Sequence, residues 1–500
     1  MKKILLILSS VFSMALSSCS GFLDKYPDNS IPADEAIQTP EDAQFYIMGL
    51  YSTFKNSALY SGSMTLAADI QCDFMYTVQG ANNVYSDVYR WELKPTTGEV
   101  ENVYAGLYYI ISRVNFFFDR IGQVEAAYTD EDDVELLNKC KGDAYFARAL
   151  AYADLLRFYC KAYDPDTAKD ELGMSLIYTY EEEGLNVLRS SLYDTYQQVL
   201  SDLAQAEKLI TRDVANSIYF TIGAVNALYA RTYLYMQDWD NAIKYSTEVI
   251  DNSIYSLSDS FAASTASADV SEYQYMWMYD SSNEVIWKVG FTATSLGGSL
   301  SSVFHNYDYT AYYPDLVPAQ WVLDLYDQSS DARYSTFFVE RTTGYASGLT
   351  WPLFIGKYWS NPNLNSTNAY TFVNEPKVFR LSEQYLIRAE AYWHNGEYEL
   401  ASQDLTAVRK KRILGYGEYS ATGETLLEEI KTERVKELYM EGFRLMDLKR
   451  WGEGFRRTPQ MYSISGPDEL DIKADNPMFV WPIPQHELDA VPGLQPNESN

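Results

Sequence analysis

Residues 230–242 read Ala-Arg-Thr-Tyr-Leu-Tyr-Met-Gln-Asp-Trp-Asp-Asn-Ala, and residues 389–401 read Ala-Glu-Ala-Tyr-Trp-His-Asn-Gly-Glu-Tyr-Glu-Leu-Ala. In both stretches an alanine is followed by a tyrosine, a short turn, a second aromatic residue and a second alanine, and the two stretches are 159 positions apart. Residues 236–238 and 395–397 both suit a tight turn. Each stretch therefore predicts two antiparallel helices, in which small residues allow close approach and aromatic side chains fill the space beside them.

Small, aromatic, turn, aromatic and small residues at these spacings follow the logic of tetratricopeptide repeats. Ala149 and Tyr152 can begin a third, degenerate copy. Because the copies lie far apart in the sequence, long insertions must project from the helical frame. We therefore predict a mainly α fold with a tetratricopeptide-like helical frame and a large inserted, loop-rich, aromatic region that contains short strands.

Apolar periodicity extends the frame in both directions. Thr39 can cap the first helix, with Pro40 at its first position. An N-terminal helical region with repeat-like units covers residues 39–251, a loop-rich insertion covers 252–380, and a C-terminal helical region with a proline-rich tail covers 381–500. Within them we predict helices at 102–121, 132–160, 190–210, 222–236, 239–251, 382–395, 398–413 and 423–449, and a strand at 284–289.

The first residues have the form of a lipoprotein signal peptide, assigned to residues 1–18. Lys2 and Lys3 precede an apolar stretch that ends in Leu-Ser-Ser-Cys, which places a lipidated cysteine at Cys19. Residues 19–38 then form an extended tether. We expect the mature chain to be attached to a membrane by its lipid anchor alone, since no later apolar run is long enough to cross one.

Charge and cysteine content exclude several classes of function. The formal net charge is −30, so nucleic acid and anionic lipid surfaces are poor partners. Cys72, Cys140 and Cys160 fit no metal-binding spacing, and we interpret them as small buried side chains. A disulfide between Cys140 and Cys160 stays open as an alternative.

The sequence contains little that resembles catalytic machinery. Its three histidines are His305, His394 and His486, and no zinc-protease, nucleophile-elbow or dinucleotide-binding motif is present. We therefore predict a protein that is not an enzyme, with no catalytic residues, no metal site and no cofactor. The remaining enzymatic alternative is a glycosidase, which needs only two carboxylates facing each other across the substrate.

Aromatic residues in irregular segments are the more informative feature. The chain has 44 Tyr, 22 Phe and 10 Trp, many of them in loops beside Asp, Asn and Arg. Flat apolar faces next to polar groups suit sugar rings, although the same surface suits peptides or packing against the frame. The candidate ligand-binding residues are Asp69, Asp73, Tyr76, Asn83, Tyr89, Arg90, Trp91, Tyr275, Trp277, Tyr279, Tyr307, Tyr309 and Tyr312.

Several segments, in order along nearly the whole chain, resemble the SusD/RagB family of outer-membrane nutrient-binding lipoproteins. They are residues 22–27 (Phe-Leu-Asp-Lys-Tyr-Pro), 41–51, 282–287, 318–334, 380–391, 433–452 and 481–488. Within residues 433–450 we interpret the alternating Arg and Glu residues as structural, because at helical spacing they can pair across turns and hold the C-terminal tail.

The resemblance implies a helical fold with an inserted ligand-binding region, and a position over a TonB-dependent transporter of the SusC type in the outer membrane, facing the cell surface. It also implies a glycan ligand that is captured and delivered to that transporter. Two alternatives stay open, namely a peptide ligand bound by the same surface and a surface glycosidase.

Overall fold

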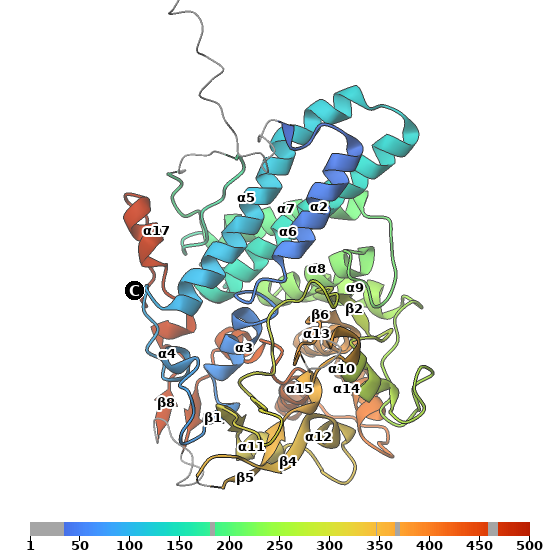
Figure 1. The fold of residues 1–500 in the computed structure, drawn as a ribbon, viewed down its shortest axis with the longest axis vertical. Coiled ribbons are helices and arrows are strands. Elements are labelled where there is room, and N and C mark those ends of the chain that lie inside the picture. Colours follow the sequence, from blue (N-terminus) through green and yellow to red (C-terminus); the bar gives the residue numbers. More distant parts are fainter. Residues whose placement is uncertain (1–34, 181–185, 347, 366–370, 459–468) are drawn as a thin grey trace, which may run out of the picture.

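The computed structural model describes residues 35–180, 186–346, 348–365, 371–458 and 469–500. The predicted signal peptide, Cys19 and most of the predicted tether lie outside these residues. Helices are the main regular structure of the described chain, and the strands are short (Figure 1). Within the described ranges, no helix is both long and apolar enough to cross a membrane.

Three helices form the upper part of the molecule in Figure 1: α2 (Pro40–Thr53), α5 (Gly98–Ala127) and α6 (Glu131–Tyr159). The hydroxyl of Thr39 accepts a hydrogen bond from the backbone N–H of Asp42 at 3.1 Å, and the Asp42 carboxylate accepts one from the backbone N–H of Thr39 at 3.0 Å. This capping box confirms the predicted start of the first helix. A fourth helix, α7 (Leu192–Leu209), packs against α6, where Arg148 and Asp202 form a buried ion pair at 2.8 Å.

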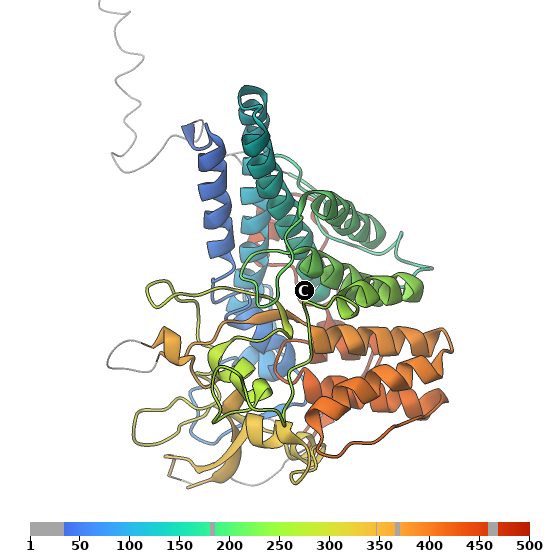
Figure 2. The same ribbon diagram turned by 90° about the vertical axis from the view of Figure 1, so that its right-hand side faces the viewer.

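Two helical hairpins correspond to the two sequence copies. They are α8 (Ile222–Met236) with α9 (Trp239–Ile250), and α13 (Leu381–His394) with α14 (Tyr398–Arg412). The hairpins lie one above the other on the right of Figure 2, with α9 against α13, and α15 (Gly423–Glu437) packs beside the second hairpin. The alanines of the pattern, Ala230, Ala242, Ala389 and Ala401, are all completely buried. The structure thus confirms the mainly α fold and its tetratricopeptide-like frame.

The prediction of one helix over residues 423–449 is wrong, because α15 ends at Glu437 and a separate helix, α16 (Arg444–Trp451), follows. Between them Met440 (φ +60°) and Gly442 (φ +84°) adopt left-handed backbone conformations, which interrupt a helix. The break also directs carbonyl groups inward, where the ammonium group of Lys357 donates to the carbonyls of Glu437 and Tyr439 at 3.3 and 2.9 Å.

Strands in the described chain form four antiparallel two-stranded sheets. The pairs are β1 (Met75–Thr77) with β3 (Leu316–Pro318), β2 (Val285–Lys288) with β6 (Lys377–Arg380), β4 (Phe338–Thr342) with β5 (Thr350–Phe354), and β7 (Phe455–Arg457) with β8 (Leu470–Ile472). β2 confirms the predicted strand. The short helices are α3 (Ser63–Ile70), α4 (Ser86–Tyr89), α10 (Glu272–Tyr279), α11 (Gln320–Asp324), α12 (Ala332–Phe337), α17 (Gln485–Ala490), η2 (Gly356–Tyr358), η3 (Pro362–Leu364) and η4 (Pro477–Phe479).

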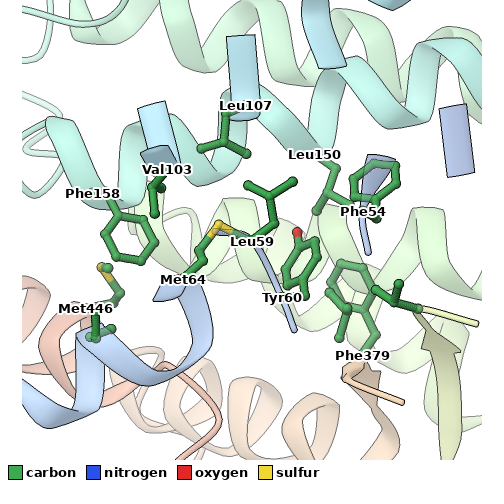
Figure 3. Packing of buried hydrophobic residues seen from close by; sticks show 14 of the residues in the cluster. Phe54, Leu59, Tyr60, Met64, Val103, Leu107, Leu150, Phe158, Phe379 and Met446 are labelled. Atoms are coloured by element: carbon green, nitrogen blue, oxygen red, sulfur yellow. The ribbon is translucent and has the colours of Figure 1, made fainter. Parts of the chain in front are cut away.

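The N-terminal and C-terminal helical regions share one hydrophobic core. Figure 3 shows Tyr60 beside Phe379 of β6, and Met446 of α16 beside Phe158 of α6. These side chains are almost completely removed from water, and each large one contributes about 1.5–3 kcal/mol to the free energy of unfolding. The three described cysteines are buried and free, which confirms their interpretation as small buried side chains.

Buried ion pairs attach the loop-rich insertion to the C-terminal helices. The guanidinium of Arg380 donates to Glu284 at 2.7 Å and to Glu437 at 3.0 Å, and that of Arg412 donates to the same two carboxylates at 2.9 and 3.0 Å. A third guanidinium, that of Arg333, donates to Glu437 at 3.2 Å. The acidic side chains of residues 433–450 therefore have structural partners, as predicted, but most of these partners lie outside the motif.

Candidate functional site

Asp69 and Asp73, two of the predicted ligand contacts, bind the protein's own chain. The carboxylate of Asp69 is fully buried and accepts hydrogen bonds from the backbone N–H groups of Gly442 at 2.9 Å and Arg444 at 2.8 Å. Burial raises the pKa of Asp69 to about 7. The carboxylate of Asp73 accepts two hydrogen bonds from the Arg444 guanidinium, at 3.0 and 2.9 Å. Because their oxygens are buried and bonded within the protein, we leave both out of the candidate site.

Tyr76, Tyr89 and Trp91 also point inward, contrary to their prediction as sugar-stacking residues. The Tyr76 hydroxyl accepts a hydrogen bond from the backbone N–H of Thr458 at 2.9 Å, and the Trp91 indole N–H donates to the carbonyl of Gln71. The Tyr89 ring is 1% exposed, and the guanidinium of the buried Arg457 lies 3.9 Å from its ring centroid. These aromatic side chains pack the loop against the core and have no face open to a ligand.

Asn83 and Arg90 lie in the same segment but are exposed. The neighbouring backbone N–H of Asn82 donates to the carboxylate of Asp315 at 2.6 Å, which holds this loop beside the start of β3. Both exposed side chains therefore remain available for polar contacts with a ligand.

The aromatic residues of α10 divide between its two faces. Trp277 is 1% exposed, with the ammonium groups of Lys357 and Lys377 4.4 and 4.7 Å from its ring centroid. Tyr275 and Tyr279 are half-buried and stack with ring centroids 4.5 Å apart. Trp277 belongs to the core, in contrast to its prediction as a ligand contact, whereas the two tyrosines remain at the surface.

Tyr307, Tyr309 and Tyr312 come together with Trp359 and Phe372 from other parts of the insertion. The ring centroids of Tyr307 and Tyr312 are 4.7 Å apart and those of Tyr307 and Tyr309 are 5.9 Å apart. Tyr309 lies 6.3 Å from Phe372, and Tyr312 lies 6.5 Å from Trp359. These are ordinary separations for interacting aromatic rings. We call these five residues the aromatic cluster.

The buried ring of His305 packs against two members of the aromatic cluster, Trp359 and Phe372. Its ring centroid is 5.1 Å from that of Phe372 and 5.7 Å from that of Trp359, and the residue is 1% exposed. Burial lowers the pKa of His305 to about 4, so the imidazole is neutral at pH 7. It therefore acts as a packing residue that adds no charge beneath the cluster.

The outer surface of the aromatic cluster combines flat rings with polar groups. Tyr309 is 54% exposed, and the other four members are partly exposed. The guanidinium of Arg341 lies 6.0 Å from the ring centroid of Tyr312, and Asn306 and Thr310 are exposed on the same loop. Such a surface can stack on the apolar face of a ring-shaped ligand while donating hydrogen bonds to its edge.

Trp359, Phe372 and His305 were not among the predicted site residues. Trp359 follows η2, and Phe372 lies in an irregular segment with a left-handed backbone (φ +55°). Neither position has a local sequence pattern that reveals its neighbours, because the contacts with residues 305–312 form only when the insertion folds.

The described residues contain no group of three or more His, Cys, Asp or Glu side chains placed to hold a metal ion.

In the loop of the aromatic cluster, the carboxylate of Asp308 accepts hydrogen bonds from the backbone N–H groups of Thr310 and Ala311, both at 2.8 Å. These hydrogen bonds and that of the Thr310 hydroxyl lower the pKa of Asp308. The Asp308 carboxylate therefore stabilises the turn of its own loop.

Two family models match this chain. One, described as the SusD family, matches residues 343–499, and the other, described as starch-binding and associating with the outer membrane, matches residues 21–234. The chain is similar to the SusD/RagB family in both of its helical regions. The resemblance seen in the sequence is thereby confirmed.

Curated relatives cover most of this chain. A SusD-like protein of Formosa agariphila is 22% identical, with 96% of each chain covered. The starch-binding protein SusD of Bacteroides thetaiotaomicron is 24% identical over 81% of this chain and 79% of its own length.

Solved structures share its fold. A SusD superfamily protein from Bacteroides thetaiotaomicron has a TM-score of 0.78 and 24% identity, covering 92% of this chain and 99% of its own. A putative sugar-binding protein from Bacteroides vulgatus has a TM-score of 0.77 and 24% identity, covering 93% and 99%. These structures confirm the helix-rich architecture of this chain.

Proposed function

We propose that this protein is a cell-surface lipoprotein that captures an oligosaccharide or polysaccharide and delivers it to a TonB-dependent outer-membrane transporter. The aromatic cluster is the observation that carries the proposal. It presents the exposed ring of Tyr309 and the partly exposed rings of Tyr307 and Tyr312 beside Arg341, Asn306 and Thr310.

The chemistry of the aromatic cluster favours a neutral sugar. Stacking on an aromatic ring requires only a flat C–H face, and the polar side chains nearby can exchange hydrogen bonds with ring hydroxyls. The family match supports the same class of ligand, since one matching model is described as starch-binding. Capture by such a surface requires no catalytic group.

A peptide ligand is the second candidate. Tyrosine-rich surfaces also bind peptides, and an extended peptide would add backbone hydrogen bonds along a strand edge such as that of β4 or β5. A glycosidase would require two carboxylates facing each other at about 5–10 Å across the aromatic surface. Asp308, the carboxylate in the cluster loop, is already hydrogen-bonded to its own backbone.

The proposal also includes the attachment of the protein to the membrane and the delivery of the glycan to a transporter. Lipidation of Cys19 would tether the protein to the outer membrane by its acyl chains, facing outward, and a SusC-like transporter would accept the captured glycan. A Cys19→Ser chain should then appear in the soluble fraction after cell lysis, whereas the unmodified chain should sediment with outer membranes.

A binding panel tests the ligand class directly. The purified mature chain is titrated by calorimetry with plant, fungal and host polysaccharides and with casein-type peptides. We expect binding in the micromolar to millimolar range to one polysaccharide without release of reducing ends. Tyr309→Ala should weaken it about tenfold, a loss of about 1.4 kcal/mol.

Tyr109→Ala is a matched control, because Tyr109 is 55% exposed, like Tyr309 at 54%, but lies on α5. Equal losses in the two variants would contradict the assignment of the aromatic cluster. Binding of peptides alone would replace the glycan proposal by the peptide one, and release of reducing ends would indicate an enzyme.

A further inference from the structure

A concave site lies at the start of α10, outside the aromatic cluster. It is a pocket of about 260 Å³ between the segment 256–266, the first turns of α10 and the segment 281–283 that leads into β2. This is just below the range for small-ligand sites, about 300–1,000 Å³, so it has room for one small ring and not for a long ligand.

Hydroxyl groups dominate the lining of this pocket, which we call the hydroxyl pocket. Neither Lys, Arg nor His lines it, and its single carboxylate, Glu272, accepts a hydrogen bond from the backbone N–H of Asp259 at 2.9 Å. A neutral ligand rich in hydrogen-bonding groups fits such a lining better than an ion. The hydroxyl side chains are Ser256, Ser258, Ser264, Thr265, Ser281 and Ser282.

One wall of the hydroxyl pocket is an aromatic ring held in place. Tyr275 lines the pocket and stacks on Tyr279, one helical turn further along α10, at a centroid distance of 4.5 Å with 24° between the ring planes. The helix itself is fixed at its start by a capping box between Ser271 and Gln274. A rigid ring beside hydroxyl groups is the combination that binds the flat face and the edge of a sugar.

The floor of the hydroxyl pocket is preformed. The hydroxyls of Ser258 and Ser282 share a hydrogen bond at 2.5 Å, and the backbone N–H of Ser258 donates to Glu284 at 2.8 Å. Glu284 belongs to the buried ion pairs of Arg380 and Arg412. Because the floor is tied to these buried ion pairs, a ligand would lose little of its binding energy to ordering the site.

Three polar side chains at the rim of the hydroxyl pocket are available to form hydrogen bonds with a ligand. Within the described chain, the side chains of Ser256, Thr265 and Asn283 are exposed and have no hydrogen-bond partner in the protein. Together they present two hydroxyls and one carboxamide, which can both donate to and accept from the hydroxyls of a ligand.

We propose that the hydroxyl pocket is a second carbohydrate subsite that binds one neutral pyranose unit, with Tyr275 stacking on the ring and Ser256, Thr265 and Asn283 bonding its hydroxyls. The subsite rests on the proposed glycan-binding function only for its biological role, since its chemistry is independent of the aromatic cluster.

The two sites are connected through a short structural path. The side chain of Asn361 donates to the carbonyl of Tyr279 at 3.1 Å, and its backbone N–H donates to the carbonyl of Val373 at 2.9 Å. Val373 follows Phe372 of the aromatic cluster. A glycan long enough to reach both sites would be held at two points, and its apparent affinity would exceed that of a short fragment by about a hundredfold.

Ligand-observed NMR and calorimetry on the purified mature chain test the subsite. The probes are neutral methyl pyranosides of the gluco, galacto, manno and xylo series, followed by oligosaccharides of increasing length. We expect one pyranoside to bind, Tyr275→Ala and Asn283→Ala each to weaken it about fivefold or more, and Tyr309→Ala to leave it unchanged.

Two controls separate binding from folding. Tyr193→Ala removes another half-buried tyrosine, on α7, and should not alter pyranoside binding. The side chain of Asn283 is exposed, so its loss should leave the melting temperature unchanged and keep the test valid even if Tyr275→Ala is destabilised.

The outcomes distinguish the two sites. If glycan binding depends on Tyr309 while Tyr275→Ala and Asn283→Ala have no effect, the subsite is refuted and the proposed function stands. If pyranoside binding depends on Tyr275 and Asn283 but no glycan depends on Tyr309, the subsite stands and the aromatic cluster loses its role. If no pyranoside binds at millimolar concentration, the subsite is refuted.

Discussion

The indole of Trp239 and the imidazole of His394 stack face to face, with ring centroids 3.8 Å apart and ring planes 2° apart. Trp239 begins the second helix of one repeat-like hairpin, and His394 ends the first helix of the next. The two hairpins are therefore joined at their turns as well as along α9 and α13.

Loss of this stacked pair should loosen the helical frame. We expect Trp239→Ala to lower the free energy of unfolding by about 2–4 kcal/mol, since the indole is half-buried and its stacking partner is left uncovered. Urea denaturation followed by circular dichroism measures the change. Trp239→Phe should restore most of it, and a variant as stable as the wild type would contradict a structural role for the pair.

The buried ion pairs predict a large cost for removing one carboxylate. Glu437→Gln leaves the guanidinium groups of Arg380 and Arg412 without part of their compensating charge, which should cost about 3–5 kcal/mol. Glu418→Gln, which breaks an exposed pair with Lys410, should cost less than about 1 kcal/mol. Similar values for the two variants, measured by denaturant titration, would refute the distinction.

Substitutions of Asp69 test whether this residue has a structural role or is the ligand contact expected from the sequence. Asp69→Ala should cost about 2–4 kcal/mol, because the backbone N–H groups of Gly442 and Arg444 lose their acceptor. Asp69→Asn keeps an acceptor oxygen and should cost less. Calorimetry should give the same glycan affinity for Asp69→Asn as for the wild type, and a selective loss of affinity in a stable Asp69→Asn chain would reinstate the residue as a ligand contact.

His305 predicts a specific pH dependence of stability. Its pKa falls from 6.5 to about 4 on folding, so the unfolded chain binds the proton more tightly. Stability due to neutral His305 is complete above pH 6.5 and is lost as the pH falls towards 4, by about 2 kcal/mol at pH 5. Relative to His305→Phe, the wild type should lose about this amount between pH 7 and pH 5. A constant difference between the two chains would show that His305 is not buried in neutral form.

Helical periodicity made the frame predictable from the sequence. The pattern of Ala230, Tyr233, Trp239 and Ala242 and its second copy specify helices, turn and close approach within a few residues. The helix prediction failed at residues 438–443, where apolar spacing continues although Met440 and Gly442 adopt left-handed backbone conformations and Lys357 binds the carbonyl of Tyr439. A contact with a residue so distant in sequence leaves no trace in local periodicity.

The site was less predictable because burial in irregular segments has no period. Tyr76, Tyr89 and Trp91 have the same neighbours in sequence as the exposed Asn83 and Arg90, yet the structure buries them. Tyr307, Tyr309 and Tyr312 could be selected from their composition, but their partners Trp359 and Phe372 could not, since these meet only in the folded insertion.

The hydrogen bond from the backbone of Gly442 to Asp69 joins residues 373 positions apart. Contacts of this kind close slowly, because the long intervening loop loses its conformational freedom before the contact contributes any stability. During synthesis the first helices emerge long before residue 442 exists. The contact between Asp69 and Gly442 can therefore form only when the polypeptide is nearly complete. A chain truncated ahead of residue 442 should therefore remain open to proteases, and the protein gains resistance to them only at the end of its own translation.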